Sequence, residues 1–155
     1  MATPAPIAQM QPAVVASAPG PVAGAARPFK PLPLVCGVAV VVSAVLPWIG
    51  GVAGANAFDV PIPFLWDLTA ANSSGGLGFI LLVLGALGAG LSFVPRAASV
   101  RRIAGTVTVA IVVAFGLQLF RLIDAGGGSA ADLLDVLGAG PFVAFAGGFL
   151  LQFSR

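Results

Sequence analysis

The stretch LPWIGGVAGANAFDVPIPFLWD, residues 46–67, interrupts an otherwise apolar chain with three prolines, two aspartates and both tryptophans. Proline lacks the backbone N–H that helix interiors and central strands require, so Pro61 and Pro63 exclude both from the middle of this stretch. We therefore expect an ordered loop that caps the apolar segments on either side. Trp48 and Trp66 are expected to anchor this loop at the headgroup level of a membrane.

The composition of the whole chain favours a membrane setting. Of 155 residues, 59% are hydrophobic and 8% are charged, whereas soluble proteins carry about 25% charged residues. This balance predicts an integral membrane protein, with the lipid bilayer as its solvent. Nucleic-acid binding needs a clustered Lys and Arg surface, which seven basic residues spread along the chain do not supply.

Catalytic chemistry is poorly represented in this chain. It has no His, Tyr or Glu and a single cysteine, Cys36, within the first apolar segment. Imidazole base catalysis, Ser-His-Asp and Cys-His arrangements, intrachain disulfides and four-ligand zinc sites are therefore excluded. We predict no catalytic residue, no cofactor and no metal ligand. A membrane enzyme that uses Asp59 or Asp67 is the least favoured class of function.

Four apolar segments, each close to the length of a membrane-crossing helix, follow a proline-rich tail. The tail, residues 1–33, has no apolar periodicity and is expected to be disordered. A cleaved signal peptide competes for the first segment, because residues 55–57 (ANA) have the small-x-small form of a cleavage site. The favoured fold is an all-α membrane protein, a four-transmembrane-helix bundle over residues 34–153, with spans at about 34–50, 77–94, 103–123 and 138–153.

Basic and acidic residues separate onto different sides of this bundle. With four spans, every basic residue except Arg121 falls on one side and all five aspartates fall on the other. Basic residues in short loops mark the cytoplasmic side. Both termini and the turn at 95–102 are therefore expected in the cytoplasm, and loop 1 (residues 51–76) outside it. The Ala, Gly, Val and Pro bias is typical of GC-rich coding sequences and favours a bacterial inner membrane.

Small residues recur at spacings that allow helices to approach closely. Between 77 and 94 they form two overlapping pairs, and between 138 and 153 glycine and alanine recur every four residues with phenylalanines on the opposite side. Such small-xxx-small patterns are typical of transmembrane helix contacts. We expect close helix packing through Gly85, Ala86, Ala89, Gly90, Gly140, Ala144 and Gly148.

The third span carries the only polar strip of the membrane part. Gln118, Arg121 and Asp124 are three residues apart and share one helical face. A charge within a bilayer usually has a partner, and Asp124 is the local candidate for Arg121. The alternative is a clamp, in which loop 1 folds over the bundle and Asp59 or Asp67 reaches Arg121 and Gln118.

A short polar segment separates the third and fourth spans. Residues 129–137 (SAADLLDVL) have the pattern of a short amphipathic helix, with Ser129 as N-cap and Asp132 in the first turn. Such a helix is expected to lie at the membrane interface.

Four short motifs carry a resemblance to a family. They are LPW at 46–48, NAFD at 56–59, FLWD at 64–67 and GAGPFVAFAGG at 138–148. Through them, the membrane part of the chain resembles small four-span membrane proteins of actinobacteria that have no assigned function. The resemblance implies the four-span fold and transfers no catalytic or binding residue.

The lack of catalytic groups favours a non-enzymatic function. We expect a membrane protein that acts by protein–protein contact, as an accessory, scaffold or self-assembling subunit, with a membrane protein partner or a second copy of the chain. The alternative is a small pore or permeability protein, holin-like or a channel subunit, since small bundles can oligomerise around water. No span carries the continuous polar stripe that would line a pore.

Overall fold

The computed structural model describes residues 31–50, 55–67 and 75–154. Within these residues the chain is helical, and its extended contacts are isolated bridges rather than β-strands. The all-α class is therefore confirmed for this part of the chain. Residues 1–30, which hold most of the expected disordered tail, lie outside the described residues, as do 51–54 and 68–74 of loop 1 and Arg155.

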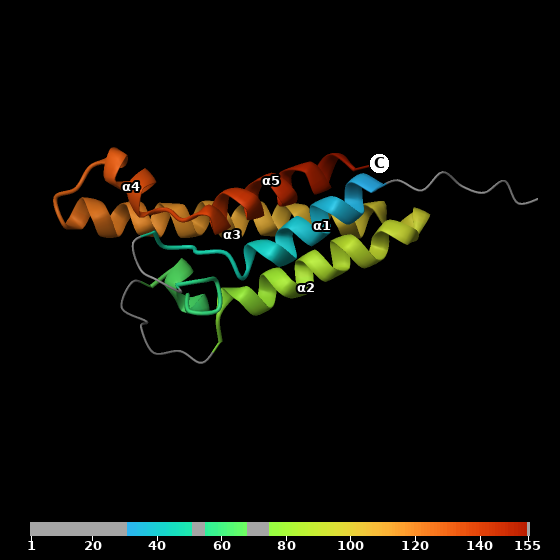
Figure 1. The fold of residues 1–155 in the computed structure, drawn as a ribbon, viewed down its shortest axis with the longest axis horizontal. Coiled ribbons are helices and arrows are strands. Elements are labelled where there is room, and N and C mark those ends of the chain that lie inside the picture. The colour runs from blue at the N-terminus through green and yellow to red at the C-terminus, as the bar shows by residue number, and fades with distance from the viewer. Residues whose placement is uncertain (1–30, 51–54, 68–74, 155) are drawn as a thin grey trace, which may run out of the picture.

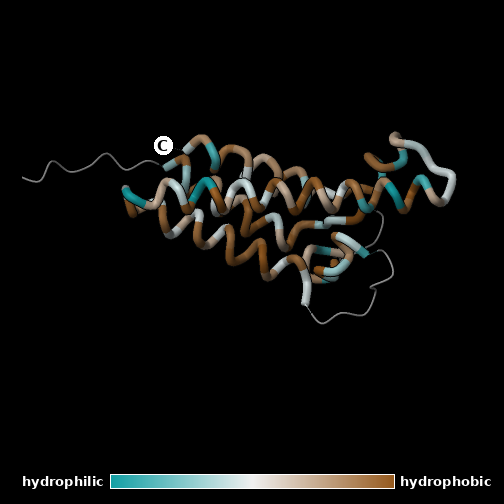
Figure 2. Tube along the Cα trace, turned by 180° about the vertical axis from the view of Figure 1, so that it is seen from behind, coloured by the Kyte–Doolittle hydropathy of each residue, from teal (hydrophilic) through white to brown (hydrophobic). Residues whose placement is uncertain are grey.

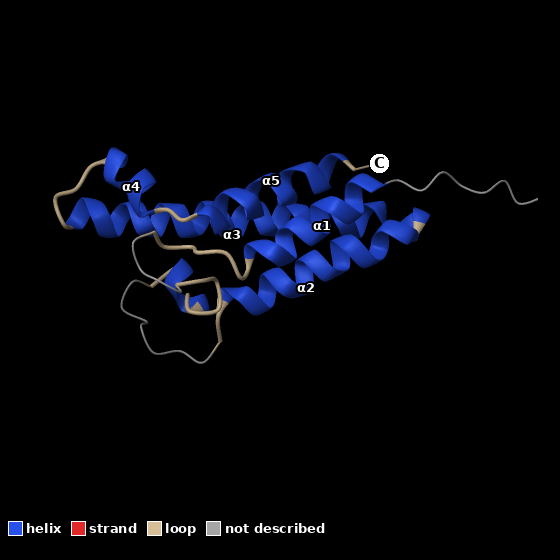
Figure 3. Ribbon diagram, viewed as in Figure 1, coloured by secondary structure: helices blue, strands red, loops and turns tan. Residues whose placement is uncertain are grey.

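Four long helices run side by side along the molecule and alternate in direction (Figures 1 and 3). Each packs against two neighbours, in the ring order α1, α2, α3 and α5. The start of α1, the end of α5 and the α2–α3 connection lie at one end, and loop 1 and α4 lie at the other (Figure 1). The elements are α1 (Pro31–Ser43), η1 (Ile62–Leu65), α2 (Leu77–Gly90), η2 (Leu91–Phe93), η3 (Pro95–Ala97), α3 (Ala98–Ala125), α4 (Ala130–Val136) and α5 (Ala139–Phe153).

The first helix differs most from its predicted bounds of 34–50. The described part of α1 starts at Pro31, where the missing N–H of a proline has no cost if it lies in the first turn of the helix. It ends at Ser43, and the chain continues to Gly50 without regular structure. Pro47 explains this early end, since its ring clashes with the carbonyl group of residue 43 and disfavours helical geometry at the preceding residue.

The irregular segment 44–50 satisfies its backbone groups by binding other parts of the chain. The Trp48 N–H donates to the Ala55 carbonyl oxygen at 2.8 Å, and the Trp48 carbonyl accepts from the Gly138 N–H at 3.1 Å. The Pro47 carbonyl accepts from the Gly140 N–H at 2.8 Å. Buried backbone groups outside helices need such partners. The segment therefore ties loop 1 to the start of α5.

The other long helices lie close to their predicted spans. α2 with η2 covers 77–93, against a prediction of 77–94, and α5 covers 139–153, against 138–153. α3 starts five residues before its predicted span of 103–123 and ends two residues after it. The predicted basic turn is correspondingly shorter, and Arg101 and Arg102 belong to the helix.

Glycines bring helix backbones into direct contact at two places. Between α1 and α2, a Cβ atom added to Gly85 would lie 2.7 Å from the Gly37 carbonyl oxygen, and one added to Gly37 would lie 2.7 Å from the Gly85 oxygen. Between α3 and α5, a Cβ added to Gly105 would lie 2.5 Å from the Gly148 oxygen. Side chains do not fit at such distances, so both contacts depend on glycine.

The buried polar groups of the bundle are mostly bonded within their own helices. The hydroxyl groups of Ser43, Thr108 and Ser154 are buried and donate to carbonyl oxygens of the preceding turn, at 2.6, 2.8 and 2.7 Å respectively. Their donors therefore need no water.

The outward faces of the four long helices are mainly apolar, and the exposed charged residues of α3, Arg102, Arg121 and Asp124, lie toward its ends. Figure 2 shows the hydrophilic segments gathered mainly toward the ends of the bundle, with hydrophobic positions along its length. By length and composition, α3 is the one described helix that could cross a membrane by itself, a test that core helices of soluble proteins also pass. Large side chains with more than half of their surface exposed include Val35, Val45, Phe79, Val83, Ile103, Val113, Leu117, Phe142 and Phe153.

Candidate functional site at the capped end of the bundle

Trp48 lies in the core of the end that loop 1 covers. Its side chain is fully buried, and its Nε1–H donates to the Ser43 carbonyl oxygen at 2.8 Å. The ring also lies over Gly140, where an added Cβ would overlap the indole. The prediction that Trp48 anchors the loop at the headgroup level is therefore wrong. Because Pro47 ends the helix early, the chain turns back and carries the indole into the bundle.

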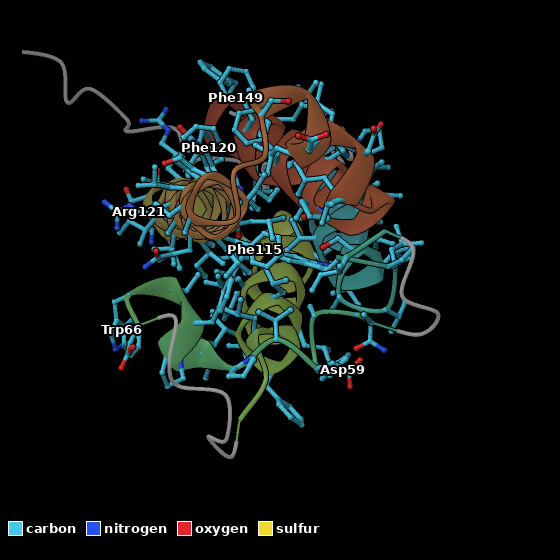
Figure 4. All side chains as sticks on the ribbon, turned by 90° about the vertical axis from the view of Figure 1, so that its left-hand side faces the viewer. Asp59, Trp66, Phe115, Phe120, Arg121 and Phe149 are labelled. Carbon is cyan, nitrogen blue, oxygen red and sulfur yellow. The ribbon has the colours of Figure 1, made fainter. Side chains whose placement is uncertain are left out.

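Phe115 of α3 connects this tryptophan to loop 1. The Phe115 and Trp48 rings meet edge to face with 4.9 Å between centroids, and Phe64 of η1 packs on Phe115 at 5.8 Å. Figure 4 places Phe115 among side chains that converge from the surrounding helices and loop 1. Aromatic pairs of this kind contribute about 0.5–1.5 kcal/mol each beyond their burial. Trp66, by contrast, is 66% exposed, as a headgroup-level anchor requires.

One polar bond joins loop 1 to the strip proposed for the clamp. The buried side-chain amide of Gln118 donates from Nε2 to the Leu65 carbonyl oxygen at 3.0 Å. Loop 1 therefore reaches Gln118 through a backbone carbonyl. Arg121 and Asp124, further along the same face of α3, are exposed.

Asp59 makes a local turn rather than a clamp. Its Oδ2 accepts from the Asn56 N–H at 3.0 Å, a bond of the kind that stabilises turns. Figure 4 shows Asp59 and Arg121 on opposite sides of the bundle, each pointing outward. Asp67 is exposed and follows η1. The structure thus brings Gln118 to loop 1 and keeps Asp59 away from Arg121.

Gln118→Leu should loosen loop 1 without unfolding the bundle. The change keeps most of the side-chain volume and removes the donor to Leu65, which costs about 1 kcal/mol, or roughly a fivefold increase in local opening. Hydrogen exchange over residues 55–67 measures this effect. Protection in α2 and α5 serves as the internal control, and unchanged exchange in 55–67 would remove Gln118 from the attachment of the loop.

Arg121→Ala and Asp59→Ala should have additive effects on the protease sensitivity of loop 1. The two side chains lie too far apart to couple directly. A double variant that departs from the sum of the single changes would reinstate a clamp between these two residues.

The three small residues of α5 that were predicted to pack all face inward. Gly140 lies against Trp48, Ala144 is fully buried, and Gly148 lies against Thr108. Phe142, Phe145, Phe149 and Phe153 are exposed on the other side of the helix. One face of α5 therefore packs and the other is an apolar surface.

The small residues of α2 divide between two faces. Gly85 and Ala89 lie against Gly37 of α1. Ala86 and Gly90 are exposed, and nothing lies within 4 Å of a Cβ added at Gly90. The bundle thus uses one of the two predicted small-residue pairs and leaves the other open.

Arg101 is buried, although the sequence pattern placed it among the charged residues of an exposed turn. It is 5% exposed, and its Nη1 donates to the carbonyl oxygens of Leu91 at 2.8 Å and Val94 at 3.3 Å. These carbonyls belong to η2 and to the residue after it, which directly follow α2, so the guanidinium caps the C-terminal extension of that helix. Pro95 was the sequence signal that a helix could begin before Arg101. Proline is favoured at the first position of a helix, so it marks a helix start as readily as a helix end.

Asp132 holds the first turn of α4, which forms as predicted with Ser129 at its N-cap. The backbone N–H of Ser129 and the Ser129 hydroxyl both donate to Oδ2 of Asp132. These bonds, the backbone one more than the hydroxyl one, lower the pKa of Asp132 below its ordinary value of 3.8. A lowered folded-state pKa means that these bonds stabilise α4 above about pH 4 and are lost as the pH falls through the folded value. We expect the protection of the α4 amides from hydrogen exchange to decrease when the pH is lowered below about 4. In Asp132→Asn that pH dependence should disappear.

No family model, curated protein or solved structure matches the chain. The resemblance to small four-span proteins of actinobacteria therefore stays a prediction. Among the described residues, no group of three or more His, Cys, Asp or Glu side chains is placed to hold a metal ion. The site is best characterised as an ordered cap, built from Trp48, Phe64, Leu65, Phe115 and Gln118.

Proposed function

We propose that the chain is an integral membrane protein in which α1, α2, α3 and α5 all cross the bilayer. The observation that carries this proposal is the mainly apolar outer face of all four helices, combined with close glycine contacts and bonded hydroxyl groups between them. In water, contiguous apolar surface of this extent causes association. In a bilayer the same surface contacts apolar lipid chains, and close packing of small residues holds the helices together.

The distribution of charge supports an orientation with both termini in the cytoplasm. Arg96, Arg101 and Arg102 lie at the end of the bundle that also holds the start of α1 and the end of α5 (Figure 1). The aspartates belong to loop 1, the end of α3 and α4, at the opposite end. Basic residues retained on the cytoplasmic side orient such bundles. A bacterial inner membrane is the setting in which we place this arrangement.

We further propose that the protein acts by contact, as an accessory, scaffold or self-assembling subunit. Ala86 and Gly90 form an open small-residue strip on α2, beside the exposed side chains of Val83 and Leu87. A second transmembrane helix can approach closely over such a strip. The partner is another membrane protein or a second copy of this chain.

Cysteine cross-linking in native membranes tests the contact. In a Cys36→Ala background, Ala86→Cys and Gly90→Cys should each give one discrete product with a short thiol cross-linker. Val113→Cys, an exposed position on α3, is the matched control and should give none. If all three positions behave alike, the open face of α2 is not the contact surface.

The pore alternative lacks a specific supporting observation. Ser43, Thr108 and Ser154 bond within their own helices, and Gln118 bonds to loop 1. Polar groups with such partners do not line a continuous water path. Release of a small dye from liposomes that depends on the reconstituted chain would reverse this preference.

A further inference from the structure

The guanidinium of Arg101 is incompletely bonded. Its Nη1 has two carbonyl acceptors, but its Nε is buried and has no acceptor among the described residues. A buried cationic N–H without a partner is costly, and native proteins retain few of them. Capping of α2 accounts for Nη1 and leaves Nε unexplained. An acceptor from outside the protein would complete the site.

The surroundings of Arg101 favour an anion as that acceptor. Arg96 and Arg102, which are close to Arg101 in the sequence, are exposed, and the five aspartates of the chain belong to segments at the other end of the bundle. α3 also begins here at Ala98, and no side chain caps its N-terminus. The free N–H groups of a helix start and nearby guanidinium groups together attract phosphate oxygens.

Exposed apolar side chains border the same turn. Val94 and Val100 are each 45% exposed, and Ile103 on α3 is 62% exposed. A ligand with a phosphate group and hydrocarbon chains therefore fits this place better than a fully water-soluble anion. We propose that the α2–α3 turn binds the phosphate group of an anionic phospholipid, held by Arg101 together with Arg96 and Arg102. This inference rests on the membrane setting proposed above.

Binding requires the buried guanidinium of Arg101 to move. The contact from Nη1 to Val94 at 3.3 Å is longer than that to Leu91 at 2.8 Å, and is the one to yield. The proposal requires the guanidinium to turn about the Leu91 bond so that Nε, which is buried in this structure, becomes accessible to a phosphate. The cap on α2 is kept while the phosphate accepts from Nε.

Arg101→Lys separates lipid binding from helix capping. Lysine keeps the positive charge and can donate to both carbonyl oxygens, but it has no Nε–H and no planar fork. The test uses the full chain in neutral detergent and follows the thermal unfolding midpoint as phosphatidylglycerol, phosphatidylcholine or inorganic phosphate is added. We expect phosphatidylglycerol alone to raise the midpoint. In Arg101→Lys the phosphatidylglycerol concentration needed should rise about tenfold, the loss of one charge-assisted hydrogen bond.

Two further variants keep this test decisive. Arg121→Lys, at the other end of α3, is the matched control and should bind phosphatidylglycerol as the unchanged chain does. If Arg101→Lys does not fold, the double change Arg96→Gln and Arg102→Gln leaves the cap intact and should weaken the phosphatidylglycerol effect severalfold.

Three outcomes would overturn the proposal. Equal responses to phosphatidylglycerol and phosphatidylcholine would remove the anion preference, and an unaltered response in Arg101→Lys would remove Arg101 from the site. Stabilisation by inorganic phosphate equal to that by phosphatidylglycerol would replace the lipid with a soluble phosphate compound. Membrane fractionation distinguishes failure of the lipid site from failure of the proposed function. If the chain resists alkaline extraction from membranes but shows no anion preference, only the lipid site is contradicted.

Discussion

Gly85→Ala is expected to destabilise the bundle by about 3 kcal/mol, the upper end of the usual cost of overpacking. The added methyl group would lie 2.7 Å from the Gly37 carbonyl oxygen and 2.7 Å from a methyl group of Val41. The first of these neighbours is backbone, so relief requires α1 and α2 to move apart along their whole contact. Unfolding by SDS titration in mild detergent measures the change.

Gly90→Ala is the matched control on the same helix. Nothing lies within 4 Å of a Cβ added there, and alanine is favoured over glycine in a helix by roughly 0.5–1 kcal/mol. The two substitutions should therefore differ in sign, with Gly90→Ala neutral or slightly stabilising. Equal destabilisation by both would contradict the packing of α2 on α1 through Gly85.

Trp48→Ala is expected to cost about 3–5 kcal/mol, the usual range for truncation of a buried large aromatic residue. The change leaves a cavity between Phe115 and Gly140 and removes the Nε1 bond to the Ser43 carbonyl. Trp66→Ala, at a side chain that is 66% exposed, should cost no more than about 0.5 kcal/mol in detergent. The same SDS titration compares the two. The reverse order would place Trp48 back at the membrane interface.

Pattern reasoning from the sequence succeeds where periodicity and capping residues act together. The helices at 77–93 and 139–153, and the short helix behind Ser129, follow directly from apolar spacing, small residues and an N-cap. The contact between loop 1 and Gln118 was expected only in the alternative clamp, which assigned the bond to an aspartate, whereas the structure has the Leu65 carbonyl as acceptor. The acceptor of the Gln118 amide could not be predicted from the sequence, since any backbone carbonyl of the loop could accept this bond.

The end of α1 could not be predicted from hydropathy. Residues 44–50 are as apolar as the helix before them, and a buried irregular segment has the same composition as a membrane helix. Its structure is set by hydrogen bonds to Ala55 of loop 1 and to Gly138 and Gly140, of which the two glycines are distant in sequence. The role of Trp48 was missed for the same reason. A tryptophan next to a helix end is typical of the interface, unless the chain turns back as it does at Pro47.

The role of Arg101 was missed because counting charges between spans treats every arginine of a turn alike. α3 extends back to Ala98, and this places Arg101 one turn inside a helix with its side chain directed toward the end of α2. Arg102, the next residue, is exposed. The two neighbouring arginines therefore differ in burial because they point to different sides of the helix. This difference can be predicted only if the start of the helix is known.

Cysteine labelling in intact cells tests the central claim, that four helices cross the membrane with both termini in the cytoplasm. Ser99 and Ala131 are exposed at opposite ends of the bundle, and each is changed to cysteine in a Cys36→Ala background. A membrane-impermeant maleimide should label Ala131→Cys in intact cells and Ser99→Cys only after permeabilisation. Labelling of both positions from the same side of the membrane would contradict the four-span account.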